Sequence, residues 1–177
     1  FGVFLSLLCA SARSIKISLI LSLLPRLFIF TDIVSPDCIE KRLKTFSMYP
    51  DYDFLVFPTG TFFHKVGDNS FVWMPKSKNL LISFLKHNIQ WTIMSPIWKR
   101  SSLKKLNDFD EDYVRLQDVE LHTRALLSPN IKFKVLSNCA VDSFYRIDEE
   151  RTSINVEKQL NNFMAGIFTY ISKIFSM

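Results

Sequence analysis

One short segment carries the side chains best suited to chemistry. Residues 117–121, QDVEL, place a carboxylate at the start of a predicted helix that ends near Leu127. The helix dipole keeps such a carboxylate ionised, and it can then accept a proton from an attacking hydroxyl group. Asp118 is therefore the candidate general base. The alternative is that Asp118 only caps the helix, which is the commoner role of an Asp in this position.

Three further polar residues follow on the same predicted helix. His122 lies four residues after Asp118, so their side chains share one helix face. That spacing fits a metal site or a proton relay, and more simply a hydrogen-bonded pair. Glu120 and Arg124 are expected to form structural ion pairs. The cysteines and the other histidines are dispersed along the chain, which argues against a metal cluster or a disulfide framework.

The segments around this helix alternate between helices and short strands. The predicted helices span residues 36–48, 80–88, 101–106, 118–127 and about 153–177. The predicted strands span 54–57, 131–136 and 139–145, with a strand or hairpin at 62–74. Residues 58–60 and 91–98 are predicted loops. This alternation predicts an α/β domain with a mixed or mostly parallel sheet, and 177 residues suffice for one such domain.

Composition limits the classes of partner. The chain has 22 Lys and Arg residues mixed with 17 acids, for a net charge of +5, and no basic tract of the kind that binds nucleic acid. Apolar runs at 1–10 and 17–30 are interrupted, and each is shorter than the roughly 20 residues that span a bilayer. Sparse, unpaired cysteines favour a reducing compartment. We therefore expect a cytoplasmic protein that does not bind nucleic acid.

Residues 91–127 resemble the acceptor-side half of family 2 glycosyltransferases. In that family a W-[KR]-[KR] step leads into L-x-x-[LI]-x-G-F-[DN]-E and then into [EQ]-D-x-E-L. This chain has WKR at 98–100, LKKLNDFDE at 103–111 and QDVEL at 117–121, in the same order and spacing. Asp108 stands where Gly is usual, and Gln117 stands where Glu is more frequent. The resemblance covers about residues 13–153 and is best from residue 32 onward.

The resemblance implies a fold and an activity. The fold is of the GT-A type, a Rossmann-like mixed sheet flanked by helices and here incomplete on its N-terminal side. The implied activity is inverting transfer from a nucleoside-diphosphate sugar to a glycan or lipid-linked acceptor, as in polysaccharide biosynthesis for the cell envelope. Asp118 would be the catalytic base. Gln117, Trp91 and Trp98 would contact the acceptor, although each Trp is equally well explained as a core residue.

The donor-binding side of the resemblance is weaker. Arg13 matches the Arg of the family's A-R-N helix, and Asp32 falls at the last acid of the cluster that binds a divalent cation, Mg²⁺ or Mn²⁺. Residues 29–31, Ile-Phe-Thr, stand where the other acidic and small residues are expected, so Asp32 is a poor metal site by itself. Arg146 is the candidate contact to the donor pyrophosphate. Its alternative is a surface ion pair with a following acid.

These observations divide the chain into three parts. Residues 1–31 are the expected remnant of the donor-binding part, 32–153 the best-matching part, and 154–177 a C-terminal helix. Because the chain lacks an initial Met, we expect a fragment. A second hypothesis, from a different class, is a non-catalytic membrane-surface or interaction protein that docks through the apolar segments 1–30 and 163–177. Peripheral contact with the inner face of a membrane is compatible with either hypothesis.

Overall fold

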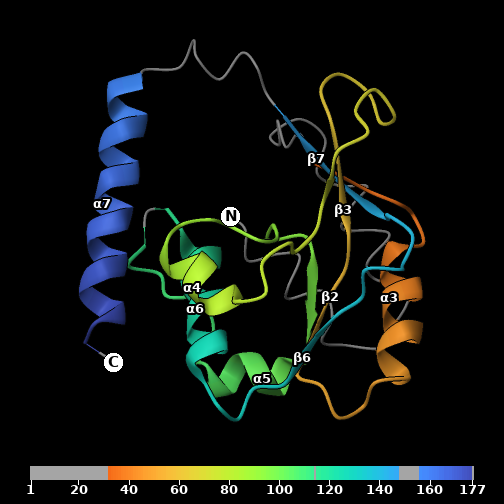
Figure 1. Ribbon diagram of the computed structural model, residues 1–177, viewed down its shortest axis with the longest axis horizontal. Coiled ribbons are helices and arrows are strands. Elements are labelled where there is room, and N and C mark those ends of the chain that lie inside the picture. Colours follow the sequence, from red (N-terminus) through yellow and green to blue (C-terminus); the bar gives the residue numbers. More distant parts are fainter. Residues whose placement is uncertain (1–31, 114, 148–155, 177) are drawn as a thin grey trace, which may run out of the picture.

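A computed structural model describes residues 32–113, 115–147 and 156–176 (Figure 1). The helices are α3 (Cys38–Ser47), α4 (Leu80–Leu85), α5 (Arg100–Lys105), α6 (Gln117–Leu127) and α7 (Val156–Ile174). The strands are β1 (Ile33–Val34), β2 (Phe54–Val56), β3 (Thr59–Phe62), β4 (Val72–Trp73), β5 (Pro96–Trp98), β6 (Phe133–Val135) and β7 (Ser143–Arg146). This is the mixed α/β fold that the alternating pattern predicts.

The strands form two mixed sheets. The first has the order β1-β7-β3-β4, and the second has the order β5-β2-β6. In each sheet one described pair is parallel, β3 with β7 and β2 with β6, and the remaining pairs are antiparallel. The chain passes directly from one sheet to the other, because only residues 57–58 separate β2 from β3. In Figure 1, α3 lies on one side of the sheets and α4, α6 and α7 lie on the other.

Strand β2 forms the centre of the core. Phe54, Leu55 and Val56 each have an exposed fraction of 0%. Successive side chains of a strand point to opposite faces. Phe54 and Val56 therefore join a large aromatic cluster that includes residues of α4, β5 and α6, whereas Leu55 joins a smaller cluster beside α3. The predicted strand at 54–57 is confirmed, and burial on both faces explains why its sequence is uniformly apolar.

Two predicted loops are wrong, because they contain strands. Thr59 and Gly60 belong to β3, which pairs with β4 and β7. A Cβ atom at Gly60 would lie 2.6 Å from a ring carbon of Phe144, so this glycine permits close packing of an aromatic ring instead of forming a turn. Residues 96–98 form β5. Pro96 is compatible with a strand there because β5 lies at the edge of its sheet.

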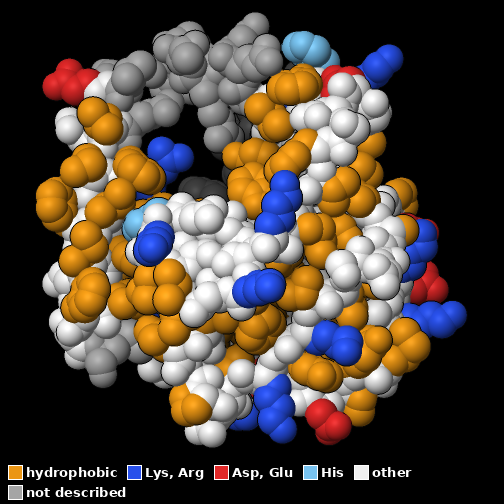
Figure 2. All heavy atoms as spheres, in the orientation of Figure 1, with side chains coloured by type: hydrophobic (Ala, Val, Ile, Leu, Met, Phe, Trp, Pro, Cys, Tyr) orange, Lys and Arg blue, Asp and Glu red, His pale blue; other side chains and the backbone are white. Residues whose placement is uncertain are grey.

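The predicted helices are confirmed, with shifts at their ends. Helix α3 begins at Cys38 after the N-cap Asp37, two residues later than predicted. Helix α4 begins after Asn79, whose side-chain oxygen accepts the N–H of Ile82 at 3.1 Å. Helix α7 stands at the edge of the molecule, and Figure 2 shows hydrophobic side chains along its outer side. None of the described helices is long and apolar enough to cross a bilayer.

A buried ion pair connects the two sheets. Arg42 of α3 and Asp142, which precedes β7, have exposed fractions of 4% and 6%, and Arg42 Nη2 lies 2.5 Å from Asp142 Oδ1. The guanidinium also donates to the carbonyl of Met94 at 2.6 Å and to the hydroxyl of Ser143 at 2.9 Å. Met94 precedes β5 in one sheet, and Ser143 begins β7 in the other. One side chain therefore holds α3 and both sheets together.

Removing one partner of this pair should destabilise the fold strongly. We expect Arg42→Met to lower the free energy of unfolding by about 3–5 kcal/mol, because it leaves the Asp142 carboxylate buried without a counter-charge. The measurement is urea unfolding followed by circular dichroism. The matched control is Lys41→Met on the same helix, which breaks an exposed pair with Asp37 and should leave the free energy of unfolding almost unchanged. Equal losses in the two variants would contradict this prediction.

Candidate functional site

Asp118 lies in the first turn of α6 and is partly buried. Burial raises the pKa of its carboxyl group above the usual value of 3.8, while hydrogen bonds from the backbone N–H groups of Asp118 and Val119 act in the opposite direction. A carboxylate whose pKa is raised in this way is a stronger base than a free one. Burial therefore outweighs the effect of the helix dipole, which the sequence predicted would keep this carboxylate ionised, and the raised pKa is the property that fits a general base.

The residue at the N-cap of this helix has an unusual backbone conformation. Leu116 has a φ of 71°, in the left-handed region that bulky residues rarely adopt. Gln117 follows it, and its side-chain amide donates to the carbonyl of Tyr113 at 2.7 Å. Strained backbone persists only where the surrounding structure holds it, and it is concentrated at functional sites. The start of α6 is therefore a position where such a site is expected.

Helix α7 holds the loop that precedes α6. Lys173 Nζ lies 2.6 Å from a carboxylate oxygen of Asp110 and 2.7 Å from one of Asp112. At Gly166, a Cβ atom would lie 3.1 Å from the carbonyl oxygen of Arg115, so the helix approaches the loop backbone closely. Because Arg115 is three residues before Asp118, α7 sets the position of the candidate base. The sequence gives no signal for this pairing, since the two carboxylates lie 61 and 63 residues from Lys173.

Glu120 and Arg124, each of which is expected to form a structural ion pair, pair with each other. Arg124 Nη2 donates to Glu120 Oε2 at 2.8 Å and to the carbonyl of Asp108 at 2.8 Å. Glu120 is buried, with an exposed fraction of 2%. The pair therefore attaches α6 to the turn after α5 and takes Glu120 away from any role as a free acid or base.

His122 is fully buried and uncharged. Burial lowers its pKa to about 3, and its ring stacks parallel to that of Trp98 with 6.1 Å between the ring centroids. Its Nδ1 atom has no hydrogen-bond partner in the described part of the chain. Burial among aromatic rings accounts for the lowered pKa, and no hydrogen bond of Nδ1 to Asp118 is present. This arrangement supports neither a proton relay through Nδ1 nor a metal site at this pair.

Both tryptophans of the predicted acceptor contact lie in the core. The exposed fractions of Trp91 and Trp98 are 0% and 6%. The ring of Trp98 stacks on Phe54 at 3.9 Å between centroids, and the ring of Trp91 packs against Phe84 at 4.6 Å. Neither ring offers a face to an acceptor in this structure. Of the two interpretations that the sequence leaves open, core packing is the one that this burial supports.

Two candidate donor contacts come together at one edge of the first sheet. A carboxylate oxygen of Asp32 accepts the backbone N–H of Arg146 at 3.2 Å. The side chain of Arg146 lies over the ring of Phe62, with 4.9 Å between the guanidinium carbon and the ring centroid. Its Nε atom is buried without a hydrogen-bond partner in the described part of the chain. The third candidate, Arg13, lies outside the described residues.

The described residues do not form a metal site. Within 32–113, 115–147 and 156–176, no group of three or more His, Cys, Asp or Glu side chains is arranged to hold an ion. Asp32 offers one carboxylate, and one of its oxygens already accepts a backbone N–H. Mg²⁺ and Mn²⁺ bind several oxygen ligands. The described donor set therefore does not fit the divalent cation that the resemblance implies.

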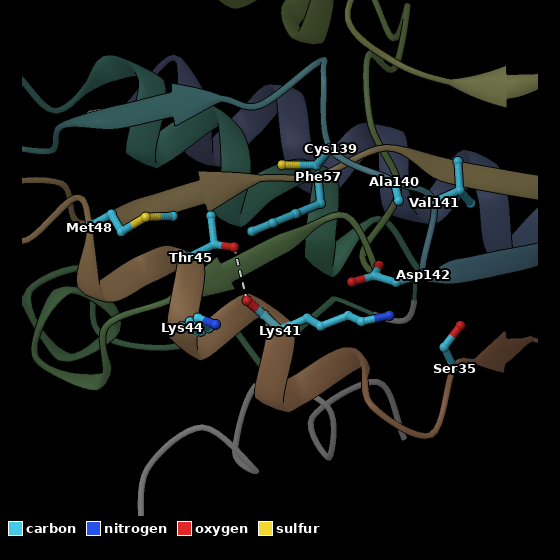
Figure 3. A pocket seen from close by; sticks show the side chains of 10 residues that line it. All are labelled: Ser35, Lys41, Lys44, Thr45, Met48, Phe57, Cys139, Ala140, Val141 and Asp142. Carbon is cyan, nitrogen blue, oxygen red and sulfur yellow. Dashed lines mark hydrogen bonds between the residues drawn. The ribbon is translucent and has the colours of Figure 1, made fainter.

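A pocket of about 320 Å³ opens elsewhere, between α3 and residues 139–142 (Figure 3). Lys41 and Lys44 lie at its α3 side, and Figure 3 shows Lys41 extending along it towards Asp142. Apolar atoms of Phe57 and Val141 line its interior. None of the residues predicted to act in catalysis or in donor or acceptor binding contributes to this lining. The pocket is thus separate from the candidate base at α6.

Comparison with known proteins gives no relative for this chain. No protein-family model matches it, and neither a curated protein nor a solved structure is significantly similar to it. The argument for function therefore depends on the residues and their geometry, together with the motif resemblance.

Replacing Asp108 by glycine should stabilise the protein. Asp108 has a φ of 55°, in the left-handed region where glycine carries no steric penalty. The glycosyltransferase family that this chain resembles usually has glycine at this position. We expect Asp108→Gly to raise the free energy of unfolding by up to about 1 kcal/mol. The control is Lys104→Gly inside α5, which should instead destabilise by about 1 kcal/mol. A loss of stability in Asp108→Gly, measured by urea unfolding, would count against this explanation.

Proposed function

We propose that this chain is the acceptor-side part of an inverting glycosyltransferase of the GT-A type, with Asp118 as its general base. The observation that carries the proposal is the setting of Asp118. Asp118 is a partly buried carboxylate with a raised pKa, and it lies two residues after the strained, left-handed Leu116. The loop before α6 is held by Lys173 of α7. The order and spacing of the WKR, LKKLNDFDE and QDVEL motifs give independent support.

The glycine position of the second motif adds further support. In the resembling family this position favours glycine, and Asp108 in this chain has a positive φ. Asp is among the residues that tolerate this conformation best after glycine. The backbone requirement of the motif is therefore met, although the residue differs.

The proposed reaction is a direct displacement at the anomeric carbon of a nucleoside-diphosphate sugar. The acceptor hydroxyl oxygen forms a bond to that carbon while the bond from the carbon to the phosphate oxygen breaks. The hydroxyl proton passes to the carboxylate of Asp118, and the electron pair of the broken bond leaves with the nucleoside diphosphate. Inversion follows from attack on the face opposite the leaving group.

Gln117, Asp32 and Arg146 have supporting roles in the proposal. Gln117 directly precedes the base, and its side-chain amide donates a hydrogen bond to the backbone carbonyl of Tyr113 in the loop. Gln117 would therefore position the acceptor indirectly, by fixing the conformation of this loop. Asp32 and Arg146 meet at one sheet edge, where the guanidinium can face the charge of a pyrophosphate. No step is assigned to a divalent cation, because the described residues do not supply its ligands.

The proposal predicts a selective loss of activity in Asp118→Asn. Removing a general base lowers the rate by about 10²–10⁴-fold. The assay is transfer or hydrolysis of a panel of sugar nucleotides with Mg²⁺ or Mn²⁺. The matched control is Asp108→Asn, because Asp108 is an exposed acid. Its contact to Arg124 is made by the backbone carbonyl, which the substitution keeps, and Asn tolerates the positive φ of this position. Turnover that is unchanged in Asp118→Asn would remove Asp118 from the mechanism, and no binding of any sugar nucleotide would contradict the function itself.

The raised pKa of Asp118 also predicts how stability and activity depend on pH. Because the pKa is higher in the folded protein than in the unfolded chain, the ionised carboxylate opposes folding at a pH above the folded pKa. Asp118→Asn should therefore be at least as stable as the wild type at pH 7, with the difference shrinking as the pH falls through the raised pKa and disappearing below the ordinary Asp pKa of 3.8. Activity should fall as the pH drops through the raised pKa. Thermal unfolding tests the stability prediction and rate measurements test the activity prediction. Both are made between about pH 3 and 8, because this range starts below the unperturbed pKa of Asp.

A further inference from the structure

An exposed apolar stripe runs along the outer side of α7. It consists of Leu160, Met164, Phe168, Ile171 and Phe175, whose exposed fractions are 56%, 40%, 65%, 46% and 83%. At 100° per residue these five side chains fall within an arc of about 80°, and they extend for about 22 Å along the helix. Large contiguous apolar patches are rare on the surfaces of soluble monomers and usually mark a binding surface.

The stripe is separate from the face that α7 packs against the domain. Tyr170 and Ile174 are buried, and the hydroxyl of Tyr170 lies 2.7 Å from that of Thr123 in α6. Lys173 is directed to Asp110 and Asp112. These contacts account for the inner face of the helix. They leave the stripe without a structural role inside the described residues.

The surface next to the stripe is basic. Residues 69–107 contain seven Lys or Arg residues and no Asp or Glu, and α4 and its flanks lie in this segment. The end of α4 contacts α7, since the rings of His87 and Tyr170 have centroids 4.8 Å apart. Figure 2 shows Lys and Arg side chains across this face, beside the hydrophobic edge at α7, with acidic side chains only at its margins.

We propose that the α7 stripe and the basic surface of residues 76–86 form one docking surface for an anionic lipid bilayer. A helix with an exposed apolar face lies in the plane of the membrane interface and buries that face among the lipids. Basic residues near the surface add attraction to anionic headgroups. Glu157, at the first turn, is the only acid of residues 156–176, so little charge on α7 opposes this contact.

The charge pattern favours a bilayer over a second copy of the chain. Two copies that met through this surface would bring the acid-free segments 69–107 close together, and like charges near an interface oppose association. An anionic bilayer is complementary both to the apolar stripe and to the lysines beside it. The inference is independent of the proposed transfer reaction, because binding to lipid requires no sugar nucleotide.

Vesicle flotation tests the proposal. We expect the full chain to float with vesicles of phosphatidylglycerol and phosphatidylcholine, to bind vesicles of phosphatidylcholine alone much more weakly, and to lose binding as salt is raised. The variant F168S/F175S should lose binding. The variant K78Q/K86Q should reduce the partition coefficient by roughly tenfold to thirtyfold, at about 1 kcal/mol for each charge.

Matched variants on the opposite side of the sheets serve as controls. Leu43 and Met48 of the α3 region are exposed apolar residues at 47% and 64%, and L43S/M48S should bind vesicles as the wild type does. Circular dichroism establishes that every variant is folded. Equal binding by F168S/F175S and wild type would overturn the proposal. A second result would also overturn it: a wild-type protein that sediments as a dimer, does not bind vesicles, and becomes monomeric in F168S/F175S. That result would assign the stripe to contact with a second copy of the chain.

Discussion

The buried contact between Arg42 and Asp142 is the interaction on which the rest of the fold depends. The two sheets share no strand among the described residues, and only residues 57–58 separate β2 of one sheet from β3 of the other. The guanidinium bonds to the segment before β5 in one sheet and to β7 in the other. A buried charge is tolerated only when it is paired and its hydrogen bonds are satisfied. The geometry of this side chain therefore constrains the relative position of the sheets, together with the buried hydrogen bond between the hydroxyls of Thr59 in β3 and Ser95 before β5, at 2.8 Å.

The candidate site depends on a second long-range constraint, from α7. The loop before α6 includes the left-handed Leu116, and Lys173 holds the acidic residues at the start of that loop. The same helix presents an apolar stripe on its opposite side. If α7 docks on a lipid surface, the candidate base lies in the first turn of α6, directly after a loop that is attached to the docking helix. Such an arrangement suits an enzyme whose acceptor is held in or near a membrane, which joins the two proposals without making either depend on the other.

Local patterns predicted much of the secondary structure but less of the site. The apolar run at 54–57 and the helix from about residue 118 were predicted because burial and helical periodicity leave direct signals in the sequence. Strand β5 was missed because Pro96 signals a loop unless the edge position of the strand is known. Strand β3 was missed because Pro58 and Gly60 together are typical of a turn. The role of Gly60 depends on the ring of Phe144, 84 residues away.

The sequence by itself determined the alternation of helices and strands, the placing of Glu120 and Arg124 four residues apart on one helix, and the place of Asp118 at a helix start. These follow from spacing within a few residues. Tertiary structure decided that Trp91 and Trp98 are core residues, that His122 is neutral, and that the Asp118 carboxyl group has a raised pKa. Burial governs all three, and burial is set by chain segments that meet only after folding.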